Sequence, residues 1–578
     1  MKNVEIARLF DLAADLLEIR GDNPFRIRAY RRAAQSIETF SEDIEVVARE
    51  GRLDQISGIG KDLADKIGEY LGTGRMKDVD ALLQEIPPGV VELMSVPGLG
   101  PKTAKLLYDK AGIRDVVTLE TLARAGQLQS LPGIKAKAEA NILKGIALIR
   151  RGQERMPLGR ALALVEEVVA ALRALPEVAQ LELAGSIRRR KDTVGDIDIL
   201  VTSSKPERVM GAFTGHSQIL DVLAAGPTKA SVRHREDIQI DLRVVEPDAF
   251  GAALVYFTGS KQHNIRIREM AVRKGLKISE YGVFDEHGTR VAGATEEDVY
   301  RAIGSPWIPP ELREDTGEIE AALRGALPRL VEPADIRGDL HEQADAPDGV
   351  EPVEALADAA RARGYQYIAV SDHRRGATAA SVRSADAWRA HVERIRQVQR
   401  ARPDITILAS IECDILPDGS MDHPDEVLAD VDIVVAAVRS ERAQPRSEMT
   451  QRICRALAHP RVHILSHPTG RRVGSREPYD VDLDEVLQTA RHQGKAVAID
   501  ASPEGTDLDD VQTRRAADLG ALVAISTDAQ GLGVSTARRA WIGPAQVVNT
   551  WPVQKLLGWA GRMLAVRSGK ASTGRRDP

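Results

Sequence analysis

The sequence predicts a multidomain protein: a helical N-terminal region, a central α+β region and a C-terminal, distorted β/α barrel. Three observations support this. Gly-containing turns recur between short helices in roughly the first 150 residues. One amphipathic helix then precedes strands that carry acidic residues. From Arg337 onward, continuous apolar strands alternate with helices, which is typical of parallel strands covered on both faces. With 578 residues, the chain is long enough for roughly three or four domains.

Composition restricts the location and the mode of binding. Hydrophobic residues make up 43% of the chain, whereas aromatic residues make up 4%, which argues against base stacking as the main binding device. The two cysteines, Cys413 and Cys454, cannot form a disulfide framework, as expected in a reducing cytoplasm. The N-terminus lacks the apolar core of a signal peptide, and no apolar run reaches the ~18 residues of a membrane span. We therefore expect a cytoplasmic protein with no membrane partner.

Three turns of the N-terminal region share the pattern apolar-x-Gly-apolar-Gly before a helix, although Lys135 replaces the second glycine of the third copy. They read ISGIG from Ile56, VPGLG from Val96 and LPGIK from Leu131. The pattern is typical of the helix-hairpin-helix motif, in which backbone N–H groups at a helix N-terminus can bind a phosphate without reading the bases. The candidate DNA-binding glycines are Gly58, Gly60, Gly98, Gly100 and Gly133.

The local charge around these turns supports a nucleic acid partner. The net charge of the whole chain is −6, but residues 81–160 hold 12 Lys and Arg against 7 Asp and Glu. A local basic excess, rather than the average charge, is what a polyanion meets.

The central region begins with a predicted helix, LGRALALVEEVVAALRAL, followed by the predicted strands QLELAGS, DIDILVTS and DIQIDLRVV. Asp196 and Asp198 alternate with isoleucines, so both carboxylates point to one side of a strand. A neighbouring strand can bring Asp241 beside them. Three carboxylates suit Mg²⁺ or Mn²⁺, and two such ions about 4 Å apart can clamp both oxygens of a phosphoryl transfer. Upstream, Gly185 and Ser186 predict a turn that a phosphate can approach, and Arg188 and Arg189 can neutralise a triphosphate.

At this point the sequence resembles a known family. The segments GSIRRRKDTVGDIDIL, DIQIDLRVV and YFTGSKQHNIRIREMAVRKGLKISEYGVF are similar to the palm and thumb of bacterial family X DNA polymerases, which also carry a C-terminal PHP (polymerase and histidinol phosphatase) domain. The resemblance covers nearly the whole chain. It implies a lyase-like domain at 1–80, helix-hairpin-helix fingers at 81–155, a nucleotidyltransferase palm at 156–250, a thumb at 251–320, a linker at 321–336 and a PHP domain at 337–578.

The resemblance implies roles for individual residues of the palm and thumb. Asp196 and Asp198 would bind both metal ions, and Asp241 would bind the catalytic ion and help to deprotonate the primer 3′-OH. The residues implied to hold the triphosphate are Ser186, Arg189 and Gly195. Those implied to shape the sugar pocket are Tyr256, Phe257 and Gly259. The resemblance further implies that Asn264 would hydrogen-bond the edge of the incoming base and that Arg268 would contact the template strand.

Lys66, in KDLADKIGEYL, matches the position of a Schiff-base lysine in the related lyases. A nucleophilic lysine needs a depressed pKa, but Asp62 stands where those lyases place a second lysine, and a nearby carboxylate acts in the opposite direction. Lys66 is therefore a candidate lyase residue, and the alternative is that it is an ordinary solvated lysine on a helix.

The PHP resemblance implies up to three metal ions, such as Mn²⁺ or Zn²⁺, and a 3′–5′ exonuclease. The matching ligand positions are His341, Asp348, His373, Glu412, His467 and Asp528. Gln343 and Gln530 replace expected histidines, Arg439 replaces a third, and Ala498 stands where an acid is common. Gln is a weak ligand for such ions, and a guanidinium cannot coordinate at all. We therefore expect the exonuclease to be weakened or lost. The alternative is that the barrel has no nuclease activity and is retained for structure or for contact with DNA.

The sequence thus predicts a template-directed, gap-filling DNA polymerase in DNA repair. It would act as a monomer, use Mg²⁺ or Mn²⁺ and deoxynucleoside triphosphates, bind gapped or nicked double-stranded DNA and work at the bacterial nucleoid. Two alternatives stay open. One is a nucleotidyltransferase that needs no template, and the other is a DNA-binding repair scaffold with inactive sites.

Overall fold

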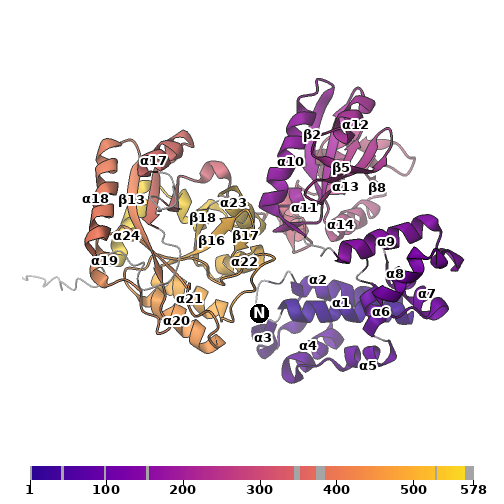
Figure 1. The fold of residues 1–578 in the computed structure, drawn as a ribbon, viewed down its shortest axis with the longest axis horizontal. Helices are drawn as coiled ribbons and strands as arrows, with labels where there is room; N and C mark the ends of the chain where they lie inside the picture. Colours follow the sequence, from indigo (N-terminus) through magenta and orange to yellow (C-terminus); the bar gives the residue numbers. More distant parts are fainter. Residues whose placement is uncertain are drawn as a thin grey trace, which may run out of the picture. The chain divides into compact units, whose positions relative to one another are not determined.

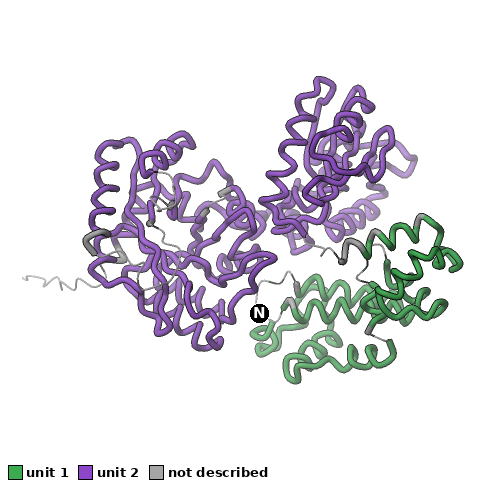
Figure 2. Tube along the Cα trace, in the orientation of Figure 1, with its two compact units in different colours: residues 1–154 green, residues 155–578 purple. Residues whose placement is uncertain are grey.

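The computed structural model describes residues 3–38, 40, 44–86, 88–94, 96, 99–150, 155–343, 352–372, 385–527 and 530–565. The chain divides into two compact units, residues 1–154 and 155–578, shown in Figure 2. The second unit contains the α+β region and the C-terminal barrel. The search for apolar helices of membrane-spanning length finds none among the described residues.

The first unit is built from short helices around one apolar core (Figure 1). Phe10, Leu17 and Ile37 are fully buried in that core. The α-helices are α1 (Asn3–Arg20), α2 (Pro24–Glu38), α3 (Ile44–Arg49), α4 (Lys61–Thr73), α5 (Lys77–Glu85), α6 (Pro88–Leu93), α7 (Pro101–Ala111), α8 (Val116–Arg124) and α9 (Ala136–Arg150).

The second unit opens with a five-stranded sheet in the order β2-β4-β7-β6-β5, in which β4 and β7 are parallel and the other neighbours antiparallel. Helices α10 (Leu158–Arg173) and α12 (Pro206–Thr214) contribute buried residues to the core of this sheet. The strands are β2 (Val178–Ala184), β4 (Asp196–Ser203), β5 (Ile219–Ala225), β6 (Lys229–His234) and β7 (Gln239–Val244). We did not predict β5 and β6. Most of β5 is exposed, and an edge strand without a buried face lacks a clear apolar alternation.

The segment that follows combines helices with a small three-stranded sheet. The helices are α13 (Phe250–Thr258), α14 (Lys261–Val272), α15 (Glu296–Ala302) and α16 (Glu318–Leu323). The strands, in the order β10-β9-β8, are β8 (Lys277–Ser279), β9 (Gly282–Phe284) and β10 (Arg290–Ala292). Val331, in the stretch expected as a linker, is fully buried, and its N–H donates to the carbonyl of Ile542 at 2.9 Å.

The C-terminal region contains seven parallel strands in the order β11-β12-β13-β14-β15-β16-β18, with β17 antiparallel to β16. The strands are β11 (Gly338–Gln343), β12 (Tyr367–Asp372), β13 (Thr406–Asp414), β14 (Ile433–Ala437), β15 (Ile464–Leu465), β16 (Ala496–Ser502), β17 (Gly505–Asp507) and β18 (Leu522–Thr527). The helices are α17 (Val353–Ala362), α18 (Ala385–Ala401), α19 (Asp425–Ala429), α20 (Arg446–Ala458), α21 (Leu483–Gln493), α22 (Asp510–Asp518), α23 (Gln530–Arg539) and α24 (Val553–Ala565).

The curled sheet is closed by a side chain rather than by a strand ladder. Asn549 is fully buried and lies between the first and last parallel strands. Its Nδ2 donates to the carbonyl of Gly338 at 3.1 Å and of Ile525 at 2.9 Å, while its Oδ1 accepts from the N–H of Ile525 at 2.7 Å. The barrel is therefore distorted at this seam, as predicted for the C-terminal region.

Candidate active site

Strands β4 and β7 bring the three predicted aspartates together. In their parallel register, Asp198 lies opposite Asp241, and Asp196 lies opposite Gln239. The alternate residues Ile197 and Ile199 are fully buried, so the strand places both of its carboxylates on the other face. Gln239 donates its Nε2 to Asp241 Oδ1 at 2.8 Å and so fixes the orientation of that carboxylate.

These carboxylates are crowded. Burial, and then the charges of Asp196 and Asp241, raise the pKa of Asp198 to about 7, against the opposing charges of Arg243 and Lys229. Burial and Asp241 also raise the pKa of Asp196. Negative charge held this closely is destabilising unless a cation lies between the oxygens. The donor set, three carboxylates on one sheet face, therefore fits divalent cations that prefer oxygen ligands.

A tight turn, α11 (Gly185–Arg188), follows β2 directly and lies against this cluster. Gly185 has φ of +64°, and a Cβ there would lie 2.7 Å from Asp198 Oδ2. Only glycine satisfies both demands. The turn places half-buried Ser186 next in the chain, and the Lys191 N–H donates to the Ser186 carbonyl at 3.1 Å. At Gly195, a Cβ would approach Arg155 Nη1 at 3.1 Å.

The two arginines after this turn are bound to protein groups. Arg188 donates both Nη atoms to Glu296, at 2.8 and 2.9 Å, and Nη1 also reaches Thr258 Oγ1 at 2.8 Å. Arg188 is thus paired with a buried carboxylate, and its role in neutralising a triphosphate stays a prediction. Arg189 donates Nε to Glu314 at 2.9 Å and Nη1 to the Thr258 carbonyl.

The residues predicted for the sugar and base contacts gather around α13 and α14. The Tyr256 and Phe257 rings meet edge to face, with 5.0 Å between centroids. Arg268 lies over Tyr256 at 5.0 Å, and Asn264 donates Nδ2 to the Tyr256 carbonyl at 2.7 Å. Gly259 ends α13 with φ of +71°, and a Cβ there would lie 3.2 Å from Arg189 Nη1.

Two basic residues of this face were not predicted. Arg243 follows Asp241 by two positions on β7, and its guanidinium lies 4.4 Å from the centroid of the Phe257 ring. Lys229 on β6 pairs with Arg243 in the strand register. Alternation along DIQIDLRVV already places Arg243 on the face of Asp241, so the signal was present in the sequence.

The three N-terminal turns have one geometry. The amide groups of Ile59, Leu99 and Ile134 each donate to the carbonyl three residues earlier, at 3.0, 2.9 and 3.2 Å. Gly60 and Gly100 are the N-cap residues of α4 and α7. The Lys135 carbonyl accepts hydrogen bonds from the N–H groups of Ala138 and Glu139. The carbonyls of Gly60 and Gly100 accept the same two bonds at the starts of their helices, so lysine at this position leaves the turn intact. Gly58 and Gly133 both have positive φ, at +84° and +85°, whereas Gly98 lies outside the described residues.

Replacing Gly60 and Gly100 together by alanine should weaken DNA binding about equally on two unrelated duplex sequences. A Cβ at either position meets nothing within 4 Å in the protein, so a loss reports on the approaching phosphate. Stability should fall by about 1 kcal/mol or less per site. Fluorescence anisotropy measures the binding, and Gly72→Ala, within α4 and also in open space, is the matched control. A loss on one sequence only would contradict phosphate binding.

Lys66 is held in ion pairs. Its side chain is 13% exposed, and its Nζ lies 2.5 Å from Asp62 Oδ2 and 3.6 Å from Asp78 Oδ2. A Schiff-base lysine must present a free amine to its substrate. Lys66 would have to leave both carboxylates to do so, and the lyase role stays a prediction.

At the C-terminal barrel, Glu412 on β13 is bound by two cations. Arg439 donates Nε to Glu412 Oε1 at 2.9 Å, and His341 Nε2 lies 3.2 Å from Glu412 Oε2. Although burial opposes protonation, the charge of Glu412 raises the pKa of His341 to about 9. A guanidinium cannot bind a metal ion, and here it occupies an oxygen of Glu412. Glu412 and His341, two of the predicted ligands, are therefore bound to protein groups in this structure.

Asp500 is a residue of this barrel end that the sequence analysis missed. It follows the buried Ala498 by two positions on β16, so both point to the barrel interior. Its Oδ1 accepts from Ser466 Oγ at 2.9 Å, and its Oδ2 lies 3.5 Å from the predicted ligand His467. Because alternate residues of a strand share a face, the position two residues after Ala498 could have identified Asp500 from the sequence. The predicted ligands Asp348, His373 and Asp528 lie outside the described residues.

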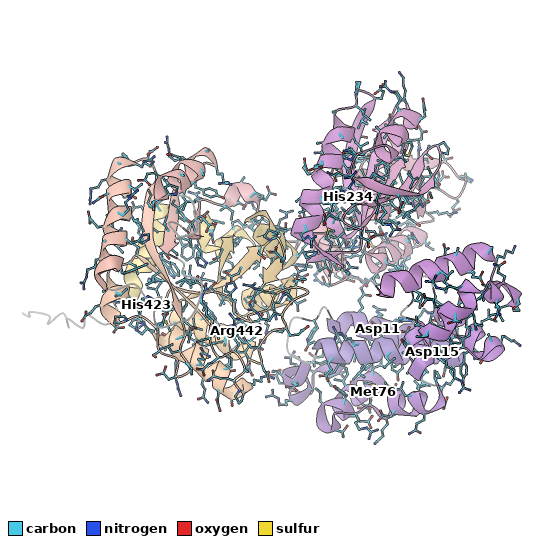
Figure 3. The ribbon with its side chains drawn as sticks, viewed as in Figure 1. Asp11, Met76, Asp115, His234, His423 and Arg442 are labelled. Carbon is cyan, nitrogen blue, oxygen red and sulfur yellow. The ribbon has the colours of Figure 1, made fainter. Side chains whose placement is uncertain are left out.

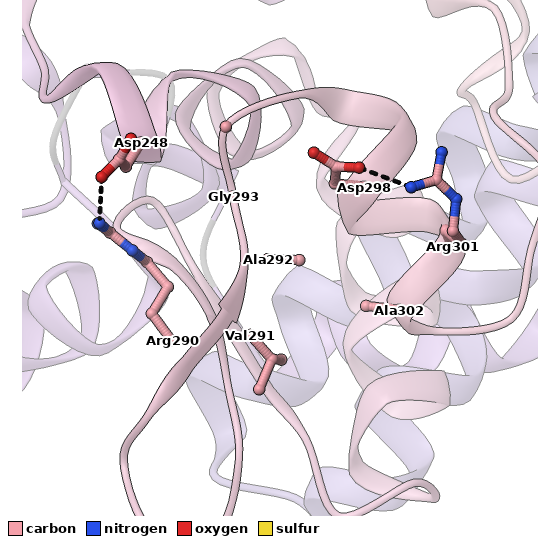
Figure 4. Close-up of a pocket in the computed structure, with 9 residues that line it drawn as sticks. Asp248, Arg290, Val291, Ala292, Gly293, Asp298, Arg301 and Ala302 are labelled. Atoms are coloured by element: carbon pink, nitrogen blue, oxygen red, sulfur yellow. Dashed lines mark hydrogen bonds and ion pairs between the residues drawn. The ribbon is translucent and has the colours of Figure 1, made fainter.

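Two other features were not predicted. Cys413, Asp422 and His423, the last labelled in Figure 3, bring one ligand atom each within 4.8 Å of one another. A surface cavity between β10 and α15 is shown in Figure 4, with the ion pairs Asp248–Arg290 at 3.1 Å and Asp298–Arg301 at 2.8 Å. Its lining contains none of the predicted site residues.

Comparisons with known proteins match the regions described above. Four family models match: a helix-hairpin-helix domain at residues 1–76, a SAM-like helix-hairpin-helix tandem at 90–147, a DNA polymerase beta palm at 155–241 and a DNA polymerase beta thumb at 253–314.

The chain is 34% identical over 560 residues to the DNA polymerase/3′-5′ exonuclease PolX of Bacillus subtilis (strain 168). The aligned residues cover 95% of this chain and 97% of that protein. It is 27% identical to DNA polymerase lambda of Rattus norvegicus, over 54% of this chain and 56% of that protein. It is also 27% identical to DNA polymerase lambda of Arabidopsis thaliana, over 54% of this chain and 62% of that protein.

Proposed function

Because this chain belongs to the family X DNA polymerases, we propose that it fills short gaps in double-stranded DNA during repair, with Asp196, Asp198 and Asp241 as its metal ligands. The observation that carries the assignment is the register of β4 and β7, which sets Asp198 opposite Asp241 beside the Gly185 turn. Divalent cations held there would stabilise the charge that develops on both oxygens of the phosphoryl transfer.

The protein groups have separate tasks in this reaction. Asp241, oriented by Gln239, accepts the proton of the primer 3′-OH. The turn of Gly185 and Ser186 brings the backbone close to the triphosphate. Arg189 supplies positive charge to the triphosphate once its ion pair with Glu314 is replaced by one with a phosphate. Tyr256 and Phe257 present bulk toward the sugar, which disfavours a 2′-OH. We expect Arg268, which stacks on Tyr256, to contact the template strand, and Asn264, which donates to the Tyr256 carbonyl, to contact the base edge.

Extension of a labelled primer in a duplex with a one-nucleotide gap, with Mg²⁺ or Mn²⁺ and each dNTP singly, tests this proposal. Template-matched incorporation that stops when the gap is filled is the expected result. Equal use of all four nucleotides, or extension of a primer without a template, would instead support a nucleotidyltransferase that needs no template. Binding without any incorporation would support the scaffold alternative.

We propose that the barrel's 3′–5′ exonuclease is weakened, in contrast to the activity that the name of the Bacillus relative includes. Arg439 occupies one oxygen of Glu412, and His341 the other. A cation fixed about 4 Å from a metal position opposes metal binding wherever solvent is excluded.

Restoring histidine at three positions should increase the metal content and the nuclease rate of the barrel. The variant is Gln343→His with Arg439→His and Gln530→His, and we expect at least a tenfold gain in Mn²⁺-dependent 3′–5′ degradation. Elemental analysis of desalted protein measures bound metal, and a labelled strand measures degradation. Arg442→His is the matched control, because the Nε of Arg442 donates to the Val438 carbonyl at 3.2 Å and not to Glu412. Robust degradation by the wild type that disappears in Glu412→Ala would contradict the proposal.

A further inference from the structure

The C-terminal barrel holds the loop that follows the Ser186 turn. Arg539, at the end of α23, has a side chain only 3% exposed. Its Nη1 donates to the Arg189 carbonyl at 2.9 Å and to Glu314 Oε1 at 3.2 Å. Its Nη2 pairs with Asp510 at the start of α22. One buried guanidinium thus joins a barrel carboxylate to the backbone of the palm loop.

A second arginine holds the other end of the same loop. Arg471 of the barrel donates Nη1 to Asp509 at 2.8 Å and Nη2 to Asp192 of the palm. Thr506 Oγ1 lies 3.4 Å from the other oxygen of Asp192. Residues 189–192, which we call the phosphate loop, are therefore fixed to the barrel at both ends.

The contact between palm and barrel also has an apolar component. Ala501 and Leu532 of the barrel belong to the apolar core of the palm sheet. Gly159, in the first turn of α10, leaves no room for a side chain, because a Cβ would lie 2.7 Å from the Cα of Pro503. Close backbone packing of this kind restricts relative movement of the two surfaces.

The hydrogen bonds of the phosphate loop connect this contact to the reacting groups. The Arg189 N–H donates to the Gly185 carbonyl at 3.2 Å, and the Lys191 N–H donates to that of Ser186 at 3.1 Å. Asp192 accepts at its carbonyl from the Leu158 N–H at 2.9 Å. A shift of the phosphate loop must therefore either break these backbone hydrogen bonds, which is costly, or carry Ser186 with it.

Charge gives Arg539 a second effect. Glu314 Oε1 accepts from Arg189 Nε at 2.9 Å as well as from Arg539. If Arg189 turns toward a triphosphate, Arg539 still donates to Glu314, and the charge of Lys191 also acts on this carboxylate. Without Arg539, the release of Arg189 would remove two of the cations that balance a buried carboxylate, which is costly.

We propose that Arg539 and Arg471 are positioning residues of the polymerase site, which hold the phosphate loop where it receives the triphosphate of the incoming nucleotide. This inference rests on the proposed function of the palm. It gives the barrel a task in polymerisation that is independent of its metal ligands.

Steady-state gap filling by the full chain tests the proposal. Arg539→Ala should raise KM for the dNTP by at least roughly tenfold, more than it lowers kcat, with Kd for gapped DNA within about twofold. Arg539→Lys should recover part of the loss, since it keeps the charge but not the forked donors. Arg538→Ala is the control, because Arg538 donates its hydrogen bonds to Glu311 at 2.7 Å and to the Val331 carbonyl at 3.2 Å, and it acts on the phosphate loop through its charge near Arg190.

The outcomes separate the alternatives. An unchanged KM in Arg539→Ala, or an equal rise in Arg538→Ala, would overturn the positioning role and leave a purely structural interface. If Arg539→Ala does not fold, Asp192→Asn, whose side chain is 22% exposed, replaces it and should raise KM in the same direction. A wild type that incorporates no nucleotide on gapped DNA would overturn the proposed function itself, and the positioning role with it.

Discussion

Replacing Asp198 by alanine should reduce nucleotide incorporation on gapped DNA by at least about 10³-fold, because a lost ligand removes several kcal/mol of metal-supplied stabilisation from the transition state. Asp198 lies opposite Asp241 in the β4–β7 register and two positions from Asp196 on β4, and both of those carboxylates already have their own place in the proposed ligand set. Single-turnover incorporation with excess enzyme measures the chemical step. Binding of gapped DNA should survive, since the helix-hairpin-helix turns of the other unit do not include this strand.

Stability distinguishes this loss from misfolding. Asp198 carries an unfavourable charge among carboxylates in the metal-free protein, so Asp198→Asn should melt no lower than the wild type. Added Mg²⁺ should raise the melting temperature of the wild type more than that of the variant, because a ligand stabilises the state that binds it. Glu182→Gln is the control, since this exposed carboxylate lies on β2 opposite Leu200 of β4. Normal incorporation by Asp198→Ala would refute the two-metal assignment.

The second large effect concerns stability. Glu296→Gln should destabilise the second unit by roughly 3–5 kcal/mol, the scale for removing one partner of a buried ion pair. The Glu296 carboxylate accepts from Arg188, from Arg313 at 2.7 and 3.1 Å, and from Trp307 Nε1 at 3.0 Å. The Arg313 side chain is fully buried, so its charge would lose the carboxylate that accepts from both of its Nη atoms without gaining water.

The same ion pair predicts a pH dependence. Burial opposes the charged form of Glu296, but Arg313 and Arg188 outweigh it and hold its pKa well below its ordinary value. The stabilisation is therefore present above the unfolded pKa, ordinarily near 4.5, and is lost as the pH falls toward the lower folded pKa. Urea unfolding at pH 7 and at pH 4 measures it. Glu297→Gln, at the neighbouring exposed position, should change neither curve. Equal unfolding free energies for Glu296→Gln and wild type would show that the network contributes nothing.

Much of the fold could be predicted from local pattern. Continuous apolar runs predicted the parallel strands of the barrel, and the repeated glycines predicted the three turns, since both signals lie within a few residues of one another. The edge strand β5 could not be predicted in this way, because most of its side chains are exposed. The closure of the barrel by Asn549 is equally invisible in the sequence, as its partners Gly338 and Ile525 lie far from it along the chain.

The sequence by itself determined which residues can do chemistry. Alternation placed Asp196 and Asp198 on one strand face, and Arg439 was recognised as incompatible with a metal ligand from its residue type alone. The tertiary structure decided which charges are available. It pairs Arg188 with Glu296, Arg439 with Glu412 and Arg539 with Glu314 and the phosphate loop. Ion pairs between residues far apart in the chain depend on packing, and once buried they cancel charges that a sequence shows as free.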